Sequence, residues 1–384
     1  MSTPFSTCIV KVVSPCNLNC TYCYEYNRGD ETWRNRPVRI SKDVVEKLAE
    51  RINEHSELHN IKEFSINAHG GEPFLLTANG LEMFYSTLLE KINPKIKLNF
   101  GLQTNATLAT EKIIDVLNKY KVSVGVSMDG YDKANEFRIN HKGEDSFEAI
   151  HKGALLIKEK AKYFSGFLCV INVNSDPIKV LDYFKSFNPP TLDLLQPFGN
   201  WDNLPHNDTV GKLGDWLSRA FHHYVTESGF EKIKIRILDD ALKTVLGGKP
   251  SVDWFGNIEP DYFIVTTDGN YEGLDTLKVV GTIGRELNLS VSDTSIEQIR
   301  QSDFIAMRSL GMEQTSKKCQ DCNIFKWCGG GYLPTRFSKE NNFKNPSVYC
   351  EDLKILFKNV AIWCKENTEV NNAVISETLM NIHG

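Results

Sequence analysis

Three cysteines near the amino terminus are the residues whose type and spacing most clearly suggest chemistry. Cys16, Cys20 and Cys23 stand in the run Pro-Cys-Asn-Leu-Asn-Cys-Thr-Tyr-Cys-Tyr, with the spacing Cys-x3-Cys-x2-Cys. Three thiolates in one loop can hold three corners of a cubane [4Fe–4S] cluster and leave the fourth iron without a protein ligand. That iron has an open coordination position, at which a second cofactor can be bound and reduced.

Zinc and disulfide chemistry are the alternatives for these three cysteines. A structural zinc ion takes four closed ligands, and the next histidine along the chain is His55. Disulfides are disfavoured because the chain has no signal peptide and carries mixed charge from its start. The three-thiolate iron–sulfur cluster is therefore favoured over both.

A second group of four cysteines lies near the carboxyl end: Cys319, Cys322, Cys328 and Cys350. Four thiolates can hold either a zinc ion or a fully ligated iron–sulfur cluster. The other three cysteines stand in apolar or helical surroundings, and we expect small buried side chains there: Cys8, Cys169 and Cys364. Cysteines gathered in two groups indicate metal sites in a reducing compartment, which predicts a cytoplasmic protein.

The first cysteine motif resembles that of the radical S-adenosylmethionine (SAM) enzymes, and the resemblance extends from residue 8 to about residue 364. It implies that the open iron binds the amino and carboxylate groups of SAM. It also implies that the backbone of Tyr22 faces adenine, that the Gly-Gly-Glu-Pro run borders the amino group, and that an arginine binds the carboxylate. The alternative for each polar residue is that its side chain only forms hydrogen bonds within its own loop. The implied SAM contacts are Tyr22, Gly70, Gly71, Glu72, Pro73, Asn105, Ser127, Asp129 and Arg138.

The carboxyl-terminal cysteine segment is similar to the iron–sulfur extension called a SPASM domain, and this resemblance disfavours zinc. The full pattern of that domain has seven cysteines and two auxiliary clusters. In this chain Leu274 and Tyr332 occupy two of the cysteine positions. The resemblance therefore implies one auxiliary [4Fe–4S] cluster with all four corners ligated by protein. Such a cluster can carry an electron or organise the domain.

The run from Cys328 to Ser338 and the run from Asn345 to Cys350 resemble the radical SAM/SPASM maturases of ribosomally made peptides, in particular those that form three-residue cyclophanes. The branch implies a carbon–carbon crosslink from an aromatic ring to the β-carbon of a nearby residue. Asp275, which follows Leu274, aligns with a catalytic aspartate of related sulfatase maturases, although a solvated turn carboxylate is the alternative. The implied partners are a precursor peptide with leader and core, and an electron donor such as flavodoxin or ferredoxin.

Two other functions remain open on the sequence. Thioether formation, epimerisation or sulfatase-type formylglycine generation would use the same two cysteine segments. A non-enzymatic zinc or iron–sulfur module is a remote alternative, and it predicts no SAM cleavage.

The elements that must position these residues alternate between strand and helix up to about residue 230. The expected strands are 8–13, 63–67, 97–103, 123–127, 166–172 and 193–196, and the expected helices are 42–55, 80–92, 111–119, 147–160, 178–187 and 212–227. Such alternation predicts an α/β fold with a parallel sheet and right-handed crossovers. The resemblance implies that the sheet curls into a partial (β/α)6 TIM-like barrel. The candidate residues follow strand ends, where ligands of parallel sheets bind.

Residues 231–384 have a different pattern, so we expect a barrel domain over 1–230 and a bridging region with a SPASM-like domain over 231–384. A hairpin is predicted around Asp268-Gly269. Because the first strand starts by Cys8, we expect no room for an amino-terminal leader-binding domain. A net charge of −5 argues against a nucleic-acid partner, and no apolar run is long enough to span a membrane.

Overall fold

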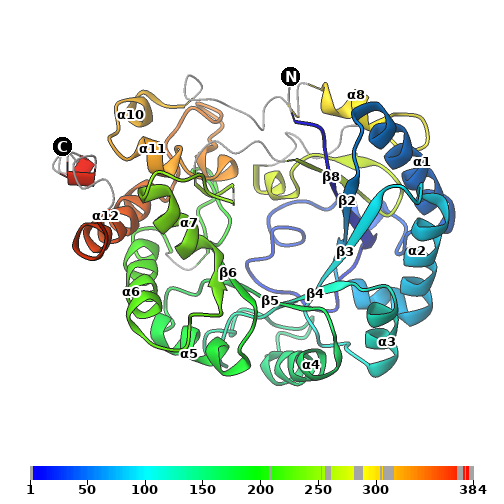
Figure 1. Ribbon diagram of the computed structural model, residues 1–384, viewed down its shortest axis with the longest axis horizontal. Coiled ribbons are helices and arrows are strands. Elements are labelled where there is room, and N and C mark those ends of the chain that lie inside the picture. Colours follow the sequence, from blue (N-terminus) through cyan, green and yellow to red (C-terminus); the bar gives the residue numbers. More distant parts are fainter. Residues whose placement is uncertain are drawn as a thin grey trace. The chain divides into compact units, whose positions relative to one another are not determined.

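The alternating strands and helices that the sequence predicts are present in the computed structural model (Figure 1). The structure describes residues 3–206, 209–251, 253–255, 261–280, 289–302, 305, 315–369, 375–376 and 378–379, without the side chain of Asp275. The chain forms two units. The first comprises residues 1–128, 136–167 and 261–308, and the second comprises residues 129–135, 168–260 and 309–384.

A parallel sheet forms the centre of the first unit. Its strands are β1 (Thr7–Val13), β2 (Glu63–Gly70), β3 (Lys97–Thr104), β4 (Ser123–Ser127) and β8 (Tyr262–Val265), with β9 (Tyr271–Glu272) at the edge. β1 pairs in parallel with β2 and with β8, β2 with β3, and β3 with β4. β8 and β9 form the predicted antiparallel hairpin, in which Gly269 has a φ of 83°. A parallel sheet gathers the loops after its strands at one edge, which is where the candidate residues lie.

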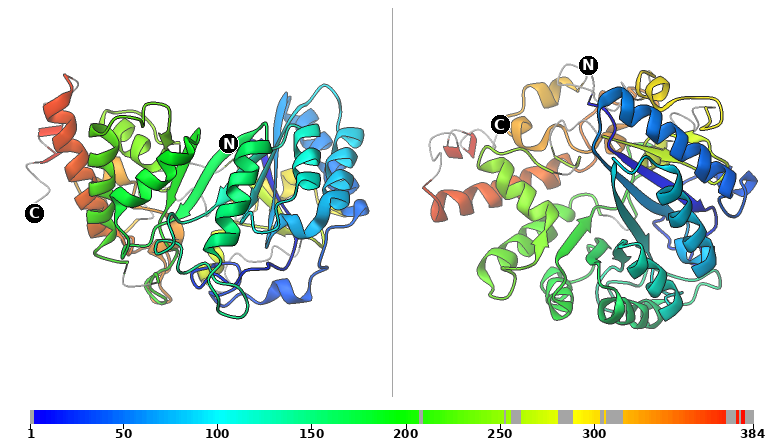
Figure 2. Two further views of the ribbon diagram at one scale, coloured as in Figure 1. Left: turned by 90° about the horizontal axis from the view of Figure 1, so that it is seen from below. Right: turned by 45° about the vertical axis from the view of Figure 1, so that its right-hand side comes forward.

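Amphipathic helices line the outer side of this sheet (Figures 1 and 2). They are α1 (Lys42–His59), α2 (Thr77–Lys91), α3 (Glu111–Lys119), α4 (Phe147–Lys160) and α8 (Ile296–Arg300). The same unit contains the 3-10 helices η1 (Thr32–Asn35), η2 (Pro73–Leu76) and η3 (Asp275–Val280). Ser41 and Thr110 cap α1 and α3, because their hydroxyls accept from the backbone N–H groups of Val44 and Ile113.

Helix α1 runs four residues beyond its predicted end at His55. It stops where Asn60 takes a left-handed φ of 54°, a conformation that asparagine tolerates. The extension matters because it adds His59 to the same helix face as His55. The three cysteines outside the two groups are fully buried, as expected: Cys8, Cys169 and Cys364.

The second unit combines the end of β5 (Phe164–Val170) with β6 (Thr191–Leu195), β7 (Lys234–Ile235) and a set of helices. The helices are α5 (Pro177–Phe187), α6 (Leu213–Thr226), α7 (Arg236–Val245), α10 (Lys317–Gln320), α11 (Phe325–Cys328), η5 (Leu333–Arg336) and α12 (Cys350–Asn367).

Helix α12 packs against α6 and α7 within this unit. A Cβ on Gly214 would lie 2.5 Å from the backbone oxygen of Asp352, so glycine permits the close approach. The Asp352 carboxylate accepts from the backbone N–H groups of Gly211 and Gly214. These contacts fix the start of α12, where Cys350 lies.

Candidate active site

The loop that carries Cys16, Cys20 and Cys23 follows β1 and is braced by a distant segment of the first unit. The backbone N–H groups of Asn19 and Thr21 donate to the carbonyls of Ile139 and Phe137, at 2.7 and 3.0 Å. His141 donates from Nε2 to the carbonyl oxygen of Cys16 at 2.9 Å. The segment 137–141 therefore holds the cysteine loop like an added strand, a contact that sequence reasoning missed.

The three thiols of this loop lie close enough to influence one another. Burial, together with the neighbouring Cys20, raises the pKa of Cys23 to about 12. Burial raises the pKa of Cys16 as well, helped by Glu72. Buried thiols of this kind ionise only when bound cations stabilise the thiolates.

A single zinc ion does not fit these three thiols. A tetrahedral zinc site with bonds of about 2.3 Å places its sulfurs roughly 3.8 Å apart. Within the described residues, the three sulfurs do not all lie within 4.8 Å of one another. The wider spacing suits a cluster of several irons, so the donor set fits the [4Fe–4S] cluster that the sequence predicts.

Gly70 and Gly71 allow the end of β2 to lie directly against the cysteine loop. A Cβ on Gly70, whose φ is 128°, would be 2.2 Å from the carbonyl oxygen of Val13, and one on Gly71 would be 1.9 Å from that of Pro15. The N–H of Gly71 donates to Val13 at 3.0 Å and that of Glu72 to Pro15 at 3.2 Å. The two glycines thus permit the close backbone contact that fixes the conformation of the cysteine loop.

Glu72 is a buried brace between the ends of β2 and β3. Its Oε1 accepts from the Thr104 hydroxyl at 2.6 Å and from the N–H of Phe74 at 3.0 Å, and its Oε2 accepts from the N–H of Asn105 at 2.7 Å. Burial raises the pKa of Glu72 to about 7, although these donors pull it down. Pro73 follows as the first residue of η2. The carboxylate therefore sets the geometry of the Thr104-Asn105 turn.

Asn105 lies beside the first cysteine. Its Nδ2 donates to Asn17 Oδ1 at 3.0 Å and lies 3.8 Å from Cys16 Sγ. Asn17 in turn donates to the Thr107 hydroxyl at 2.7 Å. An amide donor near a thiolate is a way in which a protein tunes an iron–sulfur cluster. Asn17 was not predicted, because nothing in its position between two cysteines distinguishes it from a spacer.

The remaining predicted SAM contacts fall in both units. Ser127, at the end of β4, accepts from Gln103 Nε2 at 2.8 Å. The buried guanidinium of Arg138 lies 5.7 Å from the centroid of the Tyr22 ring, so these two residues of the first unit are brought together. Asp129 belongs to the second unit, where its carboxylate accepts from the N–H of Val170 at 2.9 Å.

A group of buried charges lies behind the cysteine loop, and sequence reasoning missed it. We call Lys11, Glu25, Arg36, Glu272 and Lys278 the buried ion cluster. Glu25, two residues after Cys23, pairs with Lys11 and, at 2.5 Å, with Lys278. Glu272 pairs with Arg36 at 2.6 Å and with Lys11 at 2.9 Å.

Electrostatics keeps the carboxylates of the buried ion cluster ionised. Burial alone would raise the pKa of Glu272, but Lys11 and Lys278 outweigh burial and lower it to about 2. The same two lysines hold the pKa of Glu25 below its usual range. The cluster joins the cysteine loop to β9 and η3, the segment that contains Asp275. The side chain of Asp275 itself lies outside the described residues.

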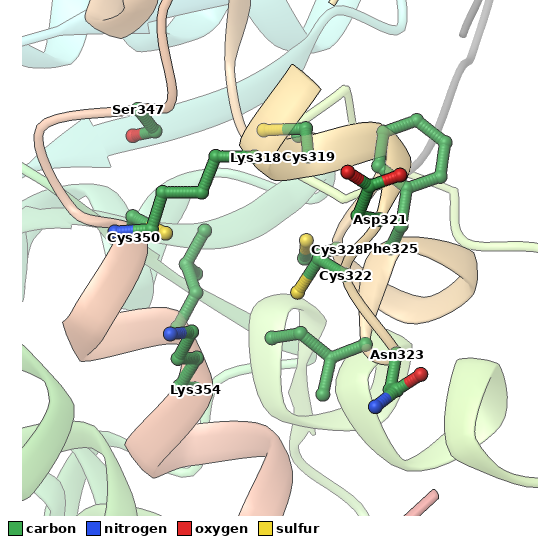
Figure 3. A pocket seen from close by; sticks show the side chains of 13 residues that line it. Lys318, Cys319, Asp321, Cys322, Asn323, Phe325, Cys328, Ser347, Cys350 and Lys354 are labelled. Carbon is green, nitrogen blue, oxygen red and sulfur yellow. The ribbon is translucent and has the colours of Figure 1, made fainter. Parts of the chain in front are cut away.

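The second group of cysteines converges in the second unit. All four line one cavity of about 240 Å³, together with Lys318 and Lys354 (Figure 3). Cys319 lies on α10, Cys322 follows it, Cys328 ends α11 and Cys350 begins α12. Burial raises the pKa of Cys328 to about 12 and that of Cys350 to about 11.

The second centre also differs from a single zinc site. As far as the structure describes the chain, no three of its sulfurs lie within 4.8 Å of one another. Four thiols around a cavity fit a cluster in which every iron has a protein ligand. Two positions that carry cysteine in the seven-cysteine pattern are filled by packed side chains. Leu274 is buried, and the Tyr332 ring stacks at 6.3 Å on Trp254.

Comparisons with known proteins agree with this geometry. The family model described as Radical SAM superfamily matches residues 10–183. A cysteine-type anaerobic sulfatase-maturating enzyme of Clostridium perfringens is 28% identical over 377 residues, which cover 92% of this chain and 96% of the relative.

Two solved structures share the fold. The structure of native anSMEcpe with bound AdoMet and Cp18Cys peptide has a TM-score of 0.79 at 24% identity and covers 94% of this chain and 98% of its own. Streptococcus suis SuiB bound to its precursor peptide SuiA has a TM-score of 0.57 at 17% identity, with coverages of 90% and 76%.

The predicted fold class, a partial (β/α)6 barrel with a SPASM-like carboxyl-terminal domain, is confirmed by these matches. None of the described helices has the length and apolar character needed to cross a membrane. The matched family model, the full-length likeness and the two cysteine centres lead to one conclusion. Residues 10–183 match the radical SAM family, and the protein therefore works as a radical SAM enzyme, with iron–sulfur clusters and S-adenosylmethionine as its cofactors.

Proposed function

We propose that this enzyme modifies a side chain of a ribosomally made precursor peptide, most specifically by forming a carbon–carbon crosslink between an aromatic ring and the β-carbon of a nearby residue. Two relatives of known structure, anSMEcpe and SuiB, were solved with bound peptides, which supports a peptide as substrate here. A leader and a core within that peptide, and a flavodoxin or ferredoxin as electron donor, are part of the proposal.

The observation that carries the proposal is the second cysteine centre. Four thiols converge on one cavity, and Leu274 and Tyr332 fill positions where the seven-cysteine pattern has ligands. This arrangement favours one closed auxiliary cluster. A peptide maturase that departs from the seven-cysteine pattern fits it better than a standard sulfatase maturase does.

The residues of the first unit have separate roles in this proposal. When bound, the reduced cluster and SAM supply a 5′-deoxyadenosyl radical, which takes a hydrogen atom from a substrate carbon. Cys16, Cys20 and Cys23 would hold the cluster. Arg138 would bind the SAM carboxylate, and Asn105 would donate toward the cluster sulfurs.

Asp275 would take the proton that the aromatic ring loses after the crosslink forms. Cys319, Cys322, Cys328 and Cys350 would hold an auxiliary cluster, which would supply an acceptor for the remaining electron. The overall change is the loss of two hydrogens from the peptide, one from the β-carbon and one from the ring.

Formylglycine generation is the second candidate, and one observation favours it. The likeness to the Clostridium perfringens sulfatase-maturating enzyme covers nearly the whole of both chains. Oxidation of a serine side chain to formylglycine also removes two hydrogens from the peptide. The mass change alone therefore does not separate the two candidate reactions.

Mass spectrometry of a modified peptide separates them by fragmentation. The reconstituted enzyme would be incubated anaerobically with SAM, dithionite and either a precursor peptide whose core contains an aromatic residue or a sulfatase-type peptide. A crosslink gives a loss of about 2 Da with no backbone fragments between the joined residues. An aldehyde gives full fragmentation and reacts with a hydrazide. An aldehyde on the sulfatase-type peptide, with the precursor unchanged, would overturn the crosslink proposal.

A further inference from the structure

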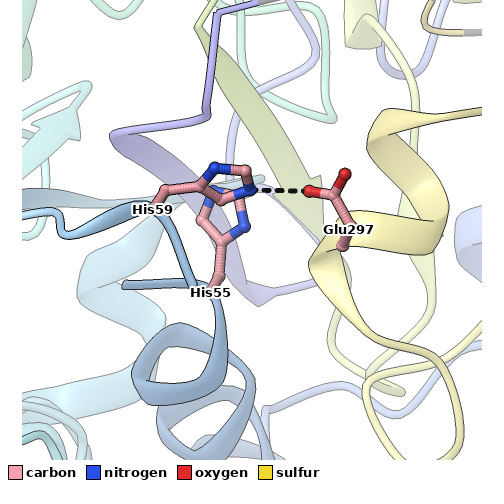
Figure 4. Close-up of side chains that lie close together, drawn as sticks. All are labelled: His55, His59 and Glu297. Atoms are coloured by element: carbon pink, nitrogen blue, oxygen red, sulfur yellow. Dashed lines mark hydrogen bonds and ion pairs between the residues drawn. The ribbon is translucent and has the colours of Figure 1, made fainter. Parts of the chain in front are cut away.

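Three metal-binding side chains meet on the outer helices of the first unit, away from both cysteine groups in the sequence. His55 and His59 are four residues apart on α1 and therefore share one helix face. Glu297 lies on α8, which packs against α1. One ligand atom from each residue lies within 4.8 Å of the other two, and no other group of three does so in the part of the chain that the structure describes. Figure 4 shows the two rings together, with the carboxylate facing them.

His55 presents a lone pair with no hydrogen-bond partner. Its Nε2 lies 3.1 Å from the carbonyl oxygen of Phe5. A carbonyl only accepts, so Nε2 carries the proton and Nδ1 carries the lone pair. Nδ1 is buried and has no partner among the described residues. A backbone carbonyl that receives the second N–H is the support that metal-binding histidines usually have.

The protonation state of His55 also suits a ligand. Burial, helped by the neighbouring His59, lowers the pKa of His55 to about 4. The ring is therefore neutral at physiological pH, and its lone pair needs no deprotonation before it binds a metal.

His59 and Glu297 complete the group. Nε2 of His59 lies 2.8 Å from Oε2 of Glu297. Arg300 donates to both carboxylate oxygens, at 2.9 and 2.8 Å, and Gln301 donates to Oε1 at 2.7 Å. These donors orient the carboxylate. The guanidinium also offsets its charge, so affinity must come mainly from the imidazole nitrogens, and nitrogen ligands favour zinc and its neighbours over magnesium or calcium.

We propose that His55 Nδ1, His59 Nε2 and the Glu297 carboxylate bind one zinc-type divalent cation, with water as the fourth ligand. Metal bonds of about 2.0 Å place tetrahedral ligands roughly 3.3 Å apart, so His59 and Glu297 would separate slightly. His59 would bind as the tautomer protonated at Nδ1, so the proton that Nε2 now donates to Glu297 would be lost to solvent while Nδ1 takes one up. The side chains of His59 and Glu297 are 19% and 21% exposed, which gives the ion and its water access from outside.

Such an ion would join α1 to α8 by bonds stronger than the present hydrogen bond. α8 follows the β8–β9 hairpin and η3, so the site would fasten the far end of the segment that contains Asp275. The proposed site does not depend on the peptide substrate or on the product.

The experiment measures zinc binding by anaerobically reconstituted holoenzyme, whose cysteines are occupied by iron. Zinc would be titrated by equilibrium dialysis and counted with iron by elemental mass spectrometry. The decisive variant is His59→Gln, because the glutamine amide can still donate to Glu297 but binds zinc poorly. The matched control is His223→Gln, since His223 pairs with Asp182 at 2.9 Å and no third ligand lies beside them among the described residues.

We expect the wild type and His223→Gln to bind one more zinc per chain than His59→Gln, with at least ~100-fold weaker binding in the variant. Zinc should also raise the melting temperature of the first two proteins and leave that of His59→Gln unchanged. Equal zinc binding by all three proteins at equal iron content would overturn the proposal. Zinc binding by His55→Gln at the wild-type level would overturn it as well.

Discussion

His55 illustrates how burial of a titratable side chain shapes the pH dependence of stability. Burial, His59 and Arg300 lower its pKa to about 4, although Phe5 and Glu297 act in the opposite direction. The ordinary value is about 6.5. Between these values the unfolded chain binds a proton that the folded chain does not. His55 therefore adds nothing to the pH dependence above about pH 6.5 and lowers stability as the pH falls toward 4.

We expect His55→Gln to remove the loss of folding stability that His55 causes as the pH falls. This loss amounts to at most about 1.4 kcal/mol per pH unit for one proton. Melting temperatures of chelator-treated holoenzyme at about pH 7.5 and about pH 5 measure it. The melting temperature of the wild type should fall more than that of His55→Gln, and His223→Gln should behave as the wild type does. Parallel decreases in all three proteins would contradict the lowered pKa.

Asp275 provides a second test at the level of one residue. If its carboxylate takes the ring proton, Asp275→Asn should slow product formation by about 10²–10⁴-fold, because an amide accepts no proton at neutral pH. Release of 5′-deoxyadenosine should persist, since hydrogen abstraction precedes that step. Liquid chromatography of both products measures the ratio. Wild-type product yield with intact clusters would exclude the role.

At the level of elements, the contact between the end of β2 and the cysteine loop controls the first cluster. A Cβ at position 71 would lie 1.9 Å from the carbonyl oxygen of Pro15, which is a backbone atom, so the backbone itself must shift. Gly71→Ala should therefore displace the loop and prevent the first cluster from assembling.

Iron analysis after reconstitution measures this effect. If each centre holds a [4Fe–4S] cluster, the iron content of Gly71→Ala should fall from about eight to about four per chain. SAM cleavage should be lost with it. The control is Gly143→Ala, because a Cβ at Gly143 meets nothing within 4 Å, although its φ of 80° adds a backbone strain that position 71 does not have. A full iron content in Gly71→Ala would show that the loop tolerates the displacement.

The elements themselves were largely predictable, because periodicity and capping residues are local signals. Helices α3 and α4 begin and end where the sequence predicts, and the serine and threonine that cap α1 and α3 are typical capping residues. The grouping of the cysteines was predictable for the same reason, since short spacings and strand order bring them together.

Contacts between distant segments were not predictable from one sequence. The brace from residues 137–141 to the cysteine loop joins segments more than 100 residues apart, and no spacing rule marks it. The buried ion cluster was missed because isolated charges such as Lys11 on β1 or Lys278 on η3 look like solvated residues. Only the fold shows that each lies opposite a charge of the other sign.

At the level of the whole molecule, the two units carry one cysteine centre each. The first centre lies in the loop around Cys16, where the reaction would start. The second centre lies within residues 319–350. If the second centre receives the electron that remains after crosslinking, a variant without this centre should still cleave SAM but should form no crosslinked product.

We expect Cys322→Ala to lose about half of the iron and all crosslinked product, while 5′-deoxyadenosine release survives. The matched control is Cys364→Ala, because Cys364 is fully buried on α12 and lies outside the cavity that the four cysteines line. It should keep both clusters and both products. Loss of deoxyadenosine release in Cys322→Ala would indicate that the damage extends to the whole protein.

The buried ion cluster also limits which substitutions this sequence can accept during evolution. Removing one member, as in Glu25→Ala, leaves Lys11 and Lys278 with excess buried positive charge around Glu272 and costs about 3–5 kcal/mol, whereas exchanging the whole set for apolar residues of similar volume is often tolerated. Lys11, Glu25, Glu272 and Lys278 should therefore covary among homologues. Mutational scans that vary one codon at a time would score all four as intolerant, and libraries that randomise them jointly should recover functional apolar combinations.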